Sequence, residues 1–529
     1  MSIFSKVAMP RPQHNVFDLS HSRKFSMSIG KITPISVMEA VPGDSFDIKT
    51  TQLVRFAPLL APVMHESSVY CHFFFVPNRI LWDNWEEYIT GGEDAADPGY
   101  TPPVFPYIEN ATSGYNVLNG SLLDYLGTPS GLLKDKISAL PSLAYNKIYN
   151  EYYRDQNLAD KAVDKAIDGK NNVLGNNFAA FNVLKQRAWQ HDYYTSALPW
   201  TQKGPEATIP LGTTAPLINE TGTQGDFNLA SYYQTTSGTT IAGAELESGT
   251  GVGVQGWLTN AGTNEARQLD ITNHTQVDLT DATASSINDL RRAFRLQEWL
   301  ERNARGGSRY IEVILAHFGV QSSDARLQRP EFLGGSATPI SISEVLQTSD
   351  AAAEDTPQGN MAGHGVSVGS SNYVSYKCEE HGYILGLMTV MPKTAYQQGI
   401  PKHFTKFDKF EYFWPSFANI GEQPILNKEL YQDSTDGLND EVFGYTPRYA
   451  EYKYIPSTVH GEFRSTLNFW HMGRIFGSRP QLNATFVECN EDEVDRVFAV
   501  TAEEENLYVY LNNKVKARRP MPYFGTPTI

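Results

Sequence analysis

The alternation of apolar and polar side chains predicts that β-strands form most of the core of this chain. The clearest run is Ser68–Val76, where Val69, Cys71, Phe73 and Phe75 fall on one face of an extended strand. The opposite face carries Tyr70, His72 and Phe74. Both faces are largely apolar, which is typical of a strand packed between two layers.

Further runs of the same kind predict more strands along the chain. They lie at Phe46–Phe56, Tyr373–Val390, Glu462–Trp470 and Gln481–Glu488. Long connections separate them, in place of tight hairpins. This pattern favours a β-sandwich whose loops carry most of the specialisation.

A smaller part of the chain has the period of a helix. One helix is expected to begin at Ser142, directly after Pro141. The clearest helix spans Ile287–Arg305, because Leu290, Phe294 and Leu300 follow the 3.6-residue period. The pair Gly306-Gly307 ends this helix, and a shorter one is expected from Ser308 to a stop at Gly319.

The sharpest change of composition lies at residues 205–285. This segment is rich in glycine, threonine, serine and asparagine, and its acidic residues far outnumber its one base, Arg267. We interpret it as an exposed, acidic insertion into a scaffold. It is either a disordered linker or a small folded excursion, for which the anchors would be Phe227, Tyr232, Tyr233 and Trp257.

Both ends of the chain are basic. Residues 1–45 are expected to form an extended arm interrupted by prolines, with the cations Lys6, Arg11, Arg23 and Lys24. Residues 511–529 are expected to form a tail with Lys514, Lys516, Arg518, Arg519 and Tyr523. Cations for the backbone and aromatic rings for the bases are what single-stranded nucleic acid requires. The tail could equally pack on an acidic surface of a neighbouring subunit.

The overall charge restricts where nucleic acid can bind. The chain of 529 residues has 43 Lys+Arg against 59 Asp+Glu, a formal net charge of −16. A negative net charge argues against a protein that binds a polyanion with its whole surface, so any contact with nucleic acid is local. Charged residues make up 19% and aromatic residues 12%. These values suit a protein that hides much surface against other copies, although an aromatic β core would contribute to the same signal.

The sequence predicts neither a disulfide framework nor membrane insertion. The cysteines Cys71, Cys378 and Cys489 are scattered and odd in number, which fits folding in a reducing compartment. The longest apolar run, Tyr383–Met391, is too short for a membrane helix. The first residues contain no apolar segment long enough for a signal peptide, so we expect a soluble chain.

Catalytic signatures are weak, so we expect no catalytic, cofactor or metal site. His65 and His72 are seven residues apart, which does not place both on one helix face for zinc. The glycines of 251–256 match a dinucleotide fingerprint but lack a surrounding βαβ unit. The acidic pairs 86–87 and 379–380 are typical of solvated faces rather than of a glycosidase.

Several motifs resemble the major capsid protein of microviruses, in its gokushovirus branch. They keep the order of that family: Asn15–Ser20, Phe73–Trp82, Ala197–Pro205, Asn303–Tyr310, His317–Val320, Asp324–Gly335, Tyr412–Pro415 and Arg519–Gly525. The resemblance covers nearly the whole chain apart from residues 205–285. In the family, an insertion at that place builds protrusions at the threefold axes.

The resemblance implies a mainly β fold, an eight-stranded antiparallel viral jelly roll with long inserted loops and a few helices. It divides the chain into an arm, 1–45, a first part of the jelly roll, 46–204, the insertion, 205–285, a second part, 286–510, and the tail, 511–529. It also implies that sixty copies, through pentamers, form a T=1 shell around circular single-stranded DNA. Two rival hypotheses, a host-surface carbohydrate-binding adhesin and a β-sandwich hydrolase, do not account for the motifs.

The partners and the location of the protein also follow from the resemblance. The expected partners are single-stranded DNA, a small basic DNA-packaging protein, other virion proteins and a host-cell receptor. The protein is expected in the virion, assembled in the host cytoplasm. We assign a DNA lining to the basic ends and a host-facing protrusion to the insertion.

Overall fold

The computed structural model describes most of the chain outside the insertion. The described residues are 13–92, 100–109, 115–172, 178–205, 207, 217–219, 246–247, 257–258, 275–277, 287–307, 309–348, 358–434, 437–500 and 505–524. The chain divides into two units, one of Met1–Thr201 with Asn303–Ile529, and one of Gln202–Arg302. The first unit contains both large sheets.

The larger sheet has seven antiparallel strands. Its main order is β1-β21-β4-β16-β15, while β2 also pairs with β21 and β17 also pairs with β4. The strands are β1 (Asn15–Asp18), β2 (His21–Met27), β4 (Ser45–Phe56), β15 (Ser341–Leu346), β16 (Met361–Ser370), β17 (Val374–Lys377) and β21 (Leu507–Arg519). Strand β21, from the C-terminal end of the sequence, therefore lies beside strands from its N-terminal end.

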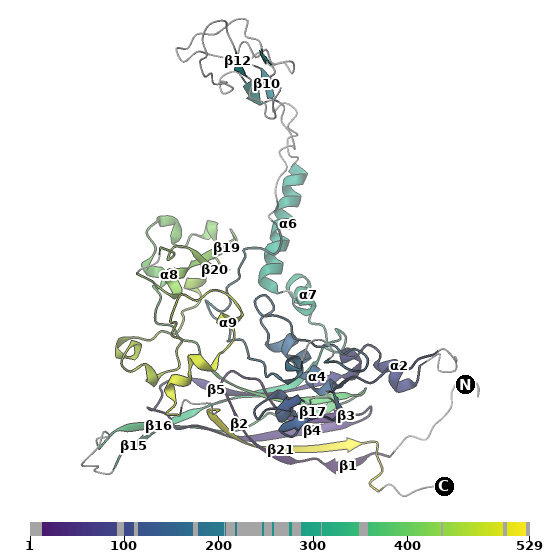
Figure 1. Cartoon of the computed structure of the whole chain (residues 1–529). Helices are drawn as coiled ribbons and strands as arrows, with labels where there is room; N and C mark the ends of the chain where they lie inside the picture. The colour runs from purple at the N-terminus through teal and green to yellow at the C-terminus, as the bar shows by residue number, and fades with distance from the viewer. Residues whose placement is uncertain are drawn as a thin grey trace. The chain divides into compact units, whose positions relative to one another are not determined.

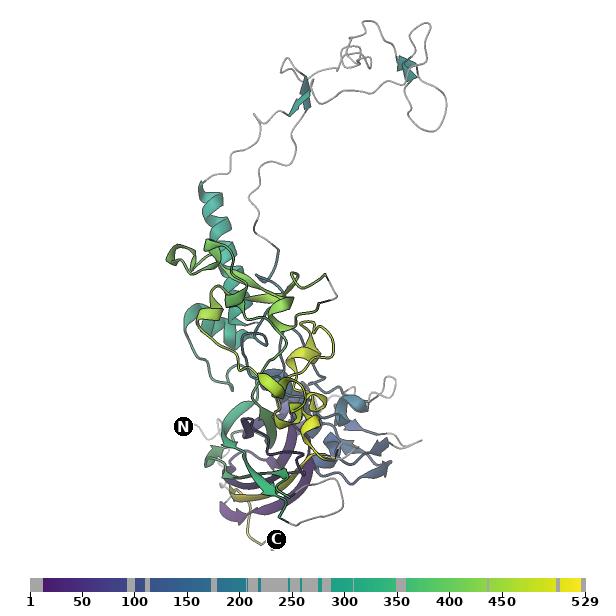
Figure 2. The same ribbon diagram turned by 90° about the vertical axis from the view of Figure 1, so that its left-hand side faces the viewer.

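The smaller sheet has four antiparallel strands in the order β14-β5-β18-β3. They are β3 (Thr33–Ala40), β5 (Ser67–Pro77), β14 (Glu331–Pro339) and β18 (Gly382–Pro392). The two sheets enclose one apolar core, to which Phe46 of β4, Phe73 of β5 and Leu511 of β21 contribute. All three side chains are fully buried. The sheets are therefore two layers of one β-sandwich (Figures 1 and 2).

A second apolar core lies on the other face of the smaller sheet. Phe74 of β5 and Leu385 of β18 pack there against Leu143 and Tyr145. These last two belong to α4. Covering on both faces explains why β5 is apolar at odd and even positions alike. The prediction of a strand between two layers is confirmed.

The helices around this core are short. They are α1 (Asn78–Leu81), α2 (Trp85–Thr90), α3 (Leu122–Leu126), α4 (Leu140–Ile148) and α5 (Ala179–Asn182), and a π-helix, η1 (Tyr149–Tyr153), continues α4. Pro141 occupies the first turn of α4, where its missing N–H costs no hydrogen bond. The minor strands are β6 (Tyr107–Ile108), β7 (Tyr115–Val117), β8 (Gly131–Leu133) and β9 (Ile137–Ser138).

The two helices predicted around residue 300 are present. They are α6 (Ile287–Gly306) and α7 (Tyr310–Phe318). Gly319 closes α7 in the left-handed conformation, at a φ of 67°, which a glycine adopts at little cost. In the described part of the chain, none of the helices is both long and apolar enough to cross a membrane.

The region from residue 393 to residue 500 is built mainly from loops and short helices. Its hairpin consists of β19 (Glu422–Leu426) and β20 (Val442–Pro447). The short helices are η3 (Lys402–Phe404), η4 (Lys409–Glu411), η5 (Pro415–Phe417), α8 (Asn427–Leu430), η6 (Ala450–Tyr452), η7 (Gly461–Arg464), η8 (Asn468–Trp470), α9 (Ala484–Val487), η9 (Glu491–Glu493) and η10 (Asp495–Val497).

Two predicted strands are wrong in this region, and a third, which precedes it, is divided. Glu462–Trp470 contains the turns of η7 and η8, and Gln481–Glu488 contains α9. The amide oxygen of Asn483 accepts a hydrogen bond from the backbone N–H of Phe486, at 3.0 Å, so a local cap outweighs the strand preference of the apolar residues. Tyr373–Val390 contains β17 and β18, separated by a turn.

The described residues nearest both ends of the chain enter the larger sheet, in contrast to the predicted arm and tail. Residues 15–18 and 21–27 are strands, and β21 extends through Arg519. Strand β21 pairs with β4 over most of its length and has partners on both sides. The residues 511–519 are therefore a central strand. Of the tail, only Pro520–Phe524 are described beyond it.

The second unit is described in short pieces. Strand β10 (Leu217–Asn219) pairs with β13 (Thr275–Val277), and β11 (Leu246–Glu247) pairs with β12 (Trp257–Leu258). Most of α6 also belongs to this unit. Phe227, Tyr232 and Tyr233 lie outside the described residues, as does the side chain of Trp257.

Candidate nucleic-acid interface

Buried and exposed side chains alternate along β21, and the exposed ones form part of the outer face of the larger sheet. Leu507, Val509, Leu511, Val515 and Ala517 are buried in the core between the sheets. The intervening side chains point to the opposite face and are exposed: Tyr508, Tyr510, Lys514, Lys516 and Arg518. Successive side chains of a strand point to opposite faces, so the same strand that supplies core residues also presents a row of cations and rings to solvent.

The neighbouring strands add further cations to this face. Residues directly opposite each other in an antiparallel pair point to the same side. Lys49 and Arg55 of β4 lie opposite residues of β21. Lys24 of β2 lies opposite Tyr510 of β21. Lys377 of β17 points to the same side, because it lies opposite Ser45 of β4. We call the cations of this surface the basic face: Lys24, Lys49, Arg55, Lys377, Lys514, Lys516 and Arg518.

The charges of the basic face are not balanced locally. Lys49 and Lys514 lie directly opposite each other, and both are exposed. Within the described residues, neither ammonium group forms an ion pair or a hydrogen bond. The carboxylates on this face are Asp18 and Asp47, and both lie opposite Lys516. Like charges placed directly opposite each other destabilise a sheet, so an anionic ligand would relieve a real cost here.

Two tyrosines accompany the cations. Tyr508 is 44% exposed and Tyr510 is 42% exposed. Both point to the side of the lysines, because they alternate with the buried Val509 and Leu511. Exposed rings beside a row of cations are the combination that binds single strands, through stacking and phosphate contacts.

Some of the predicted DNA-lining residues meet on this face and others do not. Lys24, Lys514, Lys516 and Arg518 belong to it. Tyr523 stacks on Phe17, with ring centroids 5.7 Å apart. Phe17 lies opposite the buried Ala517, so this stack is on the other side of the sheet. Lys6 and Arg11 lie outside the described residues.

The interpretation of Arg23 and Arg519 as DNA contacts does not agree with their surroundings. Arg23 points away from Lys24 and donates to the backbone oxygens of Tyr125, at 2.7 Å, and Pro34, at 3.4 Å. Burial lowers the pKa of its guanidinium. Arg519 binds the carboxylate of the fully buried Asp44, at 3.0 Å, and donates to the backbone oxygen of Glu39. Both arginines join parts of the fold.

This difference leads to a prediction for neighbouring arginines. Arg519→Ala leaves the buried carboxylate of Asp44 without its cation, so we expect a loss of about 3–5 kcal/mol in the free energy of unfolding. Arg518→Ala is the matched control, because Arg518 is exposed, and its cost should be about 0.5 kcal/mol or less. Denaturant unfolding of both variants measures this. Equal small losses would contradict the structural role of Arg519.

Sequence reasoning missed Lys49, Arg55, Lys377, Tyr508 and Tyr510. A usable signal was present, because the polar residues Asp47, Lys49 and Arg55 alternate with apolar ones along β4. The pairing that brings β4 beside β21 joins residues more than four hundred positions apart. Periodicity within one segment carries no information on such a pairing.

The candidates for other chemistry have structural partners. Nε2 of His65 bonds the backbone oxygen of Lys393, at 2.6 Å, and Nδ1 of His72 bonds the hydroxyl of Tyr153, at 2.8 Å. Burial lowers the pKa of each imidazole to about 4. Glu380 pairs with Arg79, at 2.5 Å. Among the described residues, no group of histidine, cysteine and acidic side chains could hold a metal ion, and residues 251–256 lie outside them.

The fold places the chain in the class of mainly β proteins, built from antiparallel sheets with long loops. The model of the family "Capsid protein (F protein)" matches residues 5–529. The chain belongs to this family of viral shell proteins. The resemblance to microvirus major capsid proteins is thereby confirmed.

Three relatives are similar over almost their whole length. Capsid protein VP1 of Chlamydia phage 1 is 35% identical, with 99% of this chain and 97% of the relative covered. Capsid protein VP1 of Bdellovibrio phage phiMH2K is 37% identical, with 94% and 92% covered. Capsid protein VP1 of Spiroplasma virus 4 is 33% identical, with 99% and 96% covered.

Proposed function

We propose that this chain is the major capsid protein of a small bacteriophage and has a structural, not an enzymatic, role. Sixty copies form a T=1 shell around a circular single-stranded DNA genome, and the protein resides in the virion after assembly in the host cytoplasm. The near full-length match to the capsid family carries this proposal. The same match favours a structural role over the hydrolase and adhesin hypotheses.

We propose further that the two sheets are the viral jelly roll. The smaller sheet supplies four strands, and β2, β4, β16 and β21 of the larger sheet supply the other four. The order of the strands supports this, because β18 lies between β3 and β5, and β21 lies between β2 and β4. Such interleaving of distant strands in two packed sheets is typical of a double Greek key.

The basic face is proposed as the surface that contacts the genome inside the shell. The observation that supports this assignment is that Lys49 and Lys514 lie directly opposite each other and that neither ammonium group has an ion-pair partner among the described residues. A local basic surface on a chain of net charge −16 is consistent with a genome whose remaining charge is neutralised by other cations. A small basic DNA-packaging protein is the partner proposed for that task.

The insertion, residues 205–285, is proposed as the outward protrusion at the threefold axes. Its acidic composition opposes contact with DNA and suits a position away from the genome. There it would meet a host-cell receptor, while other virion proteins join the shell elsewhere. Phe227, Tyr232, Tyr233 and Trp257 are the proposed receptor-contacting residues.

The shell itself can be tested with the purified chain. Light scattering and negative-stain microscopy should show closed shells, or pentamers that convert to shells, when single-stranded DNA and the viral partners are supplied. A chain that stays monomeric under every one of these conditions would contradict the proposal.

A further inference from the structure

An exposed aromatic loop lies in the loop region of the first unit. We define the aromatic loop as Lys402–Trp414. Phe407 is 90% exposed, and five more large rings of the loop are at least 48% exposed: Phe404, Phe410, Tyr412, Phe413 and Trp414. Contiguous apolar surface of this kind is uncommon on a protein that acts alone and marks a contact site.

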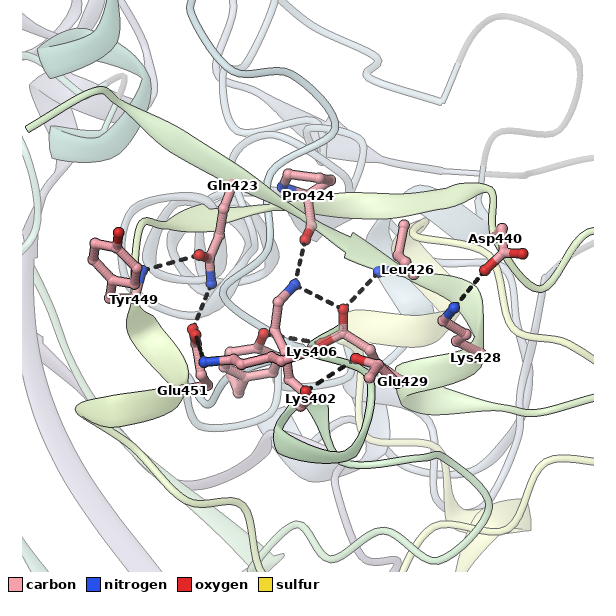
Figure 3. A network of polar contacts seen from close by, with 12 residues as sticks. Lys402, Lys406, Gln423, Pro424, Leu426, Lys428, Glu429, Asp440, Tyr449 and Glu451 are labelled. Atoms are coloured by element: carbon pink, nitrogen blue, oxygen red, sulfur yellow. Dashed lines mark hydrogen bonds and ion pairs between the residues drawn. The ribbon is translucent and has the colours of Figure 1, made fainter. Parts of the chain in front are cut away.

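Two ion pairs hold the aromatic loop in place (Figure 3). Lys402 binds Glu429 at 2.9 Å, and the Glu429 side chain is 1% exposed. Lys406 binds Glu451 at 2.7 Å, with the two side chains 5% and 12% exposed. Both lysines point inward, while Phe404 and Phe407, which follow them, are exposed. The loop therefore presents its rings from a fixed backbone.

Hydrogen bonds inside the loop fix its tip. The carboxylate of Glu411 accepts from the backbone N–H groups of Phe407, at 2.6 Å, and Asp408, at 3.0 Å. These bonds lower the pKa of Glu411. The two acids of the tip, Asp408 and Glu411, accept backbone hydrogen bonds within the loop, and Lys409 is the exposed cation between them. A rigid aromatic tip loses little conformational entropy on binding, which is the property of an interface anchor.

The loop packs at one end of the hairpin β19–β20. This end is the pair Glu422–Pro447, and the opposite end is the pair Leu426–Val442. Phe413 contacts the ring of Tyr449 just beyond Pro447, with centroids 5.0 Å apart. In Figure 3, Tyr449 and Glu451 lie on one side of the network and Asp440 lies on the other.

An acidic hollow lies at the opposite end of the same hairpin. We define the acidic hollow by its lining residues, which enclose about 600 Å³: Asn427, Tyr431, Asp433, Glu441, Val442, Phe443, Gly477, Ser478, Arg479, Pro480, Gln481 and Leu482. Glu441 is exposed and its carboxylate has no partner among the described residues. Asp440, next to it in the sequence, pairs with Lys428 at 2.5 Å, and the lining also contains one cation, Arg479. Val442, Phe443, Pro480 and Leu482 supply an apolar part.

We propose that the aromatic loop of one copy docks in the acidic hollow of the next copy. Phe407 enters the hollow against its apolar part, and Lys409 pairs with Glu441. The two surfaces are complementary at this pair of sites, since Lys409 stands among exposed rings on the loop and the unpaired carboxylate of Glu441 stands beside apolar side chains in the hollow. The volume of the hollow exceeds that of a phenylalanine side chain. Burial of such a ring contributes most to the free energy of binding where water is excluded.

The two surfaces are different patches at opposite ends of one hairpin. We propose a head-to-tail contact, in which each copy offers its loop to one neighbour and its hollow to another. Such contacts form a ring when the rotation between successive copies closes. The inference rests on the proposed function, because shell formation is what brings a second copy to this surface.

Reversal of the two charges tests the contact directly. Lys409→Glu and Glu441→Lys should each weaken association of subunits by about tenfold or more, since each places like charges across the interface. The double variant should recover association to within about threefold of the unmodified chain, because the pair is restored in opposite order. Analytical ultracentrifugation at one salt concentration measures all four proteins.

The outcomes separate this contact from the proposed function. An additive loss in the double variant would overturn the proposed contact. Phe407→Ser should also weaken association, whereas Ile167→Ser, at an exposed apolar position elsewhere, should not. Equal effects of these two changes would overturn the role of Phe407. If the unmodified chain never associates, the shell function fails with the contact. If it associates and the reversals have no effect, only the contact fails.

Discussion

A chain with Lys49, Lys514 and Lys516 changed to glutamine should lose most of its affinity for single-stranded DNA while it keeps its fold. The three side chains lie together on the basic face and are not part of the core. On single strands, the logarithm of the binding constant falls with the logarithm of salt by about 0.7 per phosphate neutralised. The slope of the variant should therefore be shallower by about 2.

Fluorescence anisotropy of a labelled oligonucleotide at several salt concentrations measures this slope. The matched control changes Lys134, Lys161 and Lys165 to glutamine, which removes the same charge from exposed positions outside the larger sheet. Its slope should stay close to that of the unmodified chain. Equal slopes for the two variants would mean that net charge, rather than the basic face, governs the binding of DNA.

Particles that lack residues 208–285 should form normally and fail to adsorb to host cells. The deletion spares both sheets and their common core, because every core residue that the structure describes between the sheets lies outside the segment. Shell formation should therefore continue, while the proposed receptor-contacting surface is absent. Negative-stain microscopy measures the shells, and the loss of free particles after mixing with cells measures adsorption.

A second variant makes the test of the insertion more specific. Serine at Phe227, Tyr232, Tyr233 and Trp257 keeps the length of the segment and removes its largest apolar side chains. We expect reduced adsorption with normal shells. Full adsorption by the deleted particles would exclude the insertion as the host-facing element.

The strands of the core could be predicted from the sequence because their signal is local. β4 and β5 show a regular alternation or a continuous apolar run, and α6 shows a clear helical period. The prediction of a tail at 511–529 is wrong for residues 511–519, which belong to β21, because clustered charges and Pro520 are also typical of an irregular tail. The alternation of Val515 and Ala517 with cations was the better guide.

The candidate site was predictable only in part. Lys514 and Lys516 could be found because they stand in one short basic segment. The inward turn of Arg519 depends on Asp44, and the completion of the face by Lys49 depends on the pairing of β4 with β21. These are contacts between distant segments. They arise from packing and leave no periodic trace in either segment.

The orientation of the larger sheet in assembled particles tests the central claim most directly. Electron cryo-microscopy of DNA-filled particles would show which face of this sheet points inward. We expect Lys49, Lys514, Tyr508 and Tyr510 to face the interior, with nucleic-acid density against them. A basic face on the outer surface of the shell, or one covered by a neighbouring copy, would contradict it.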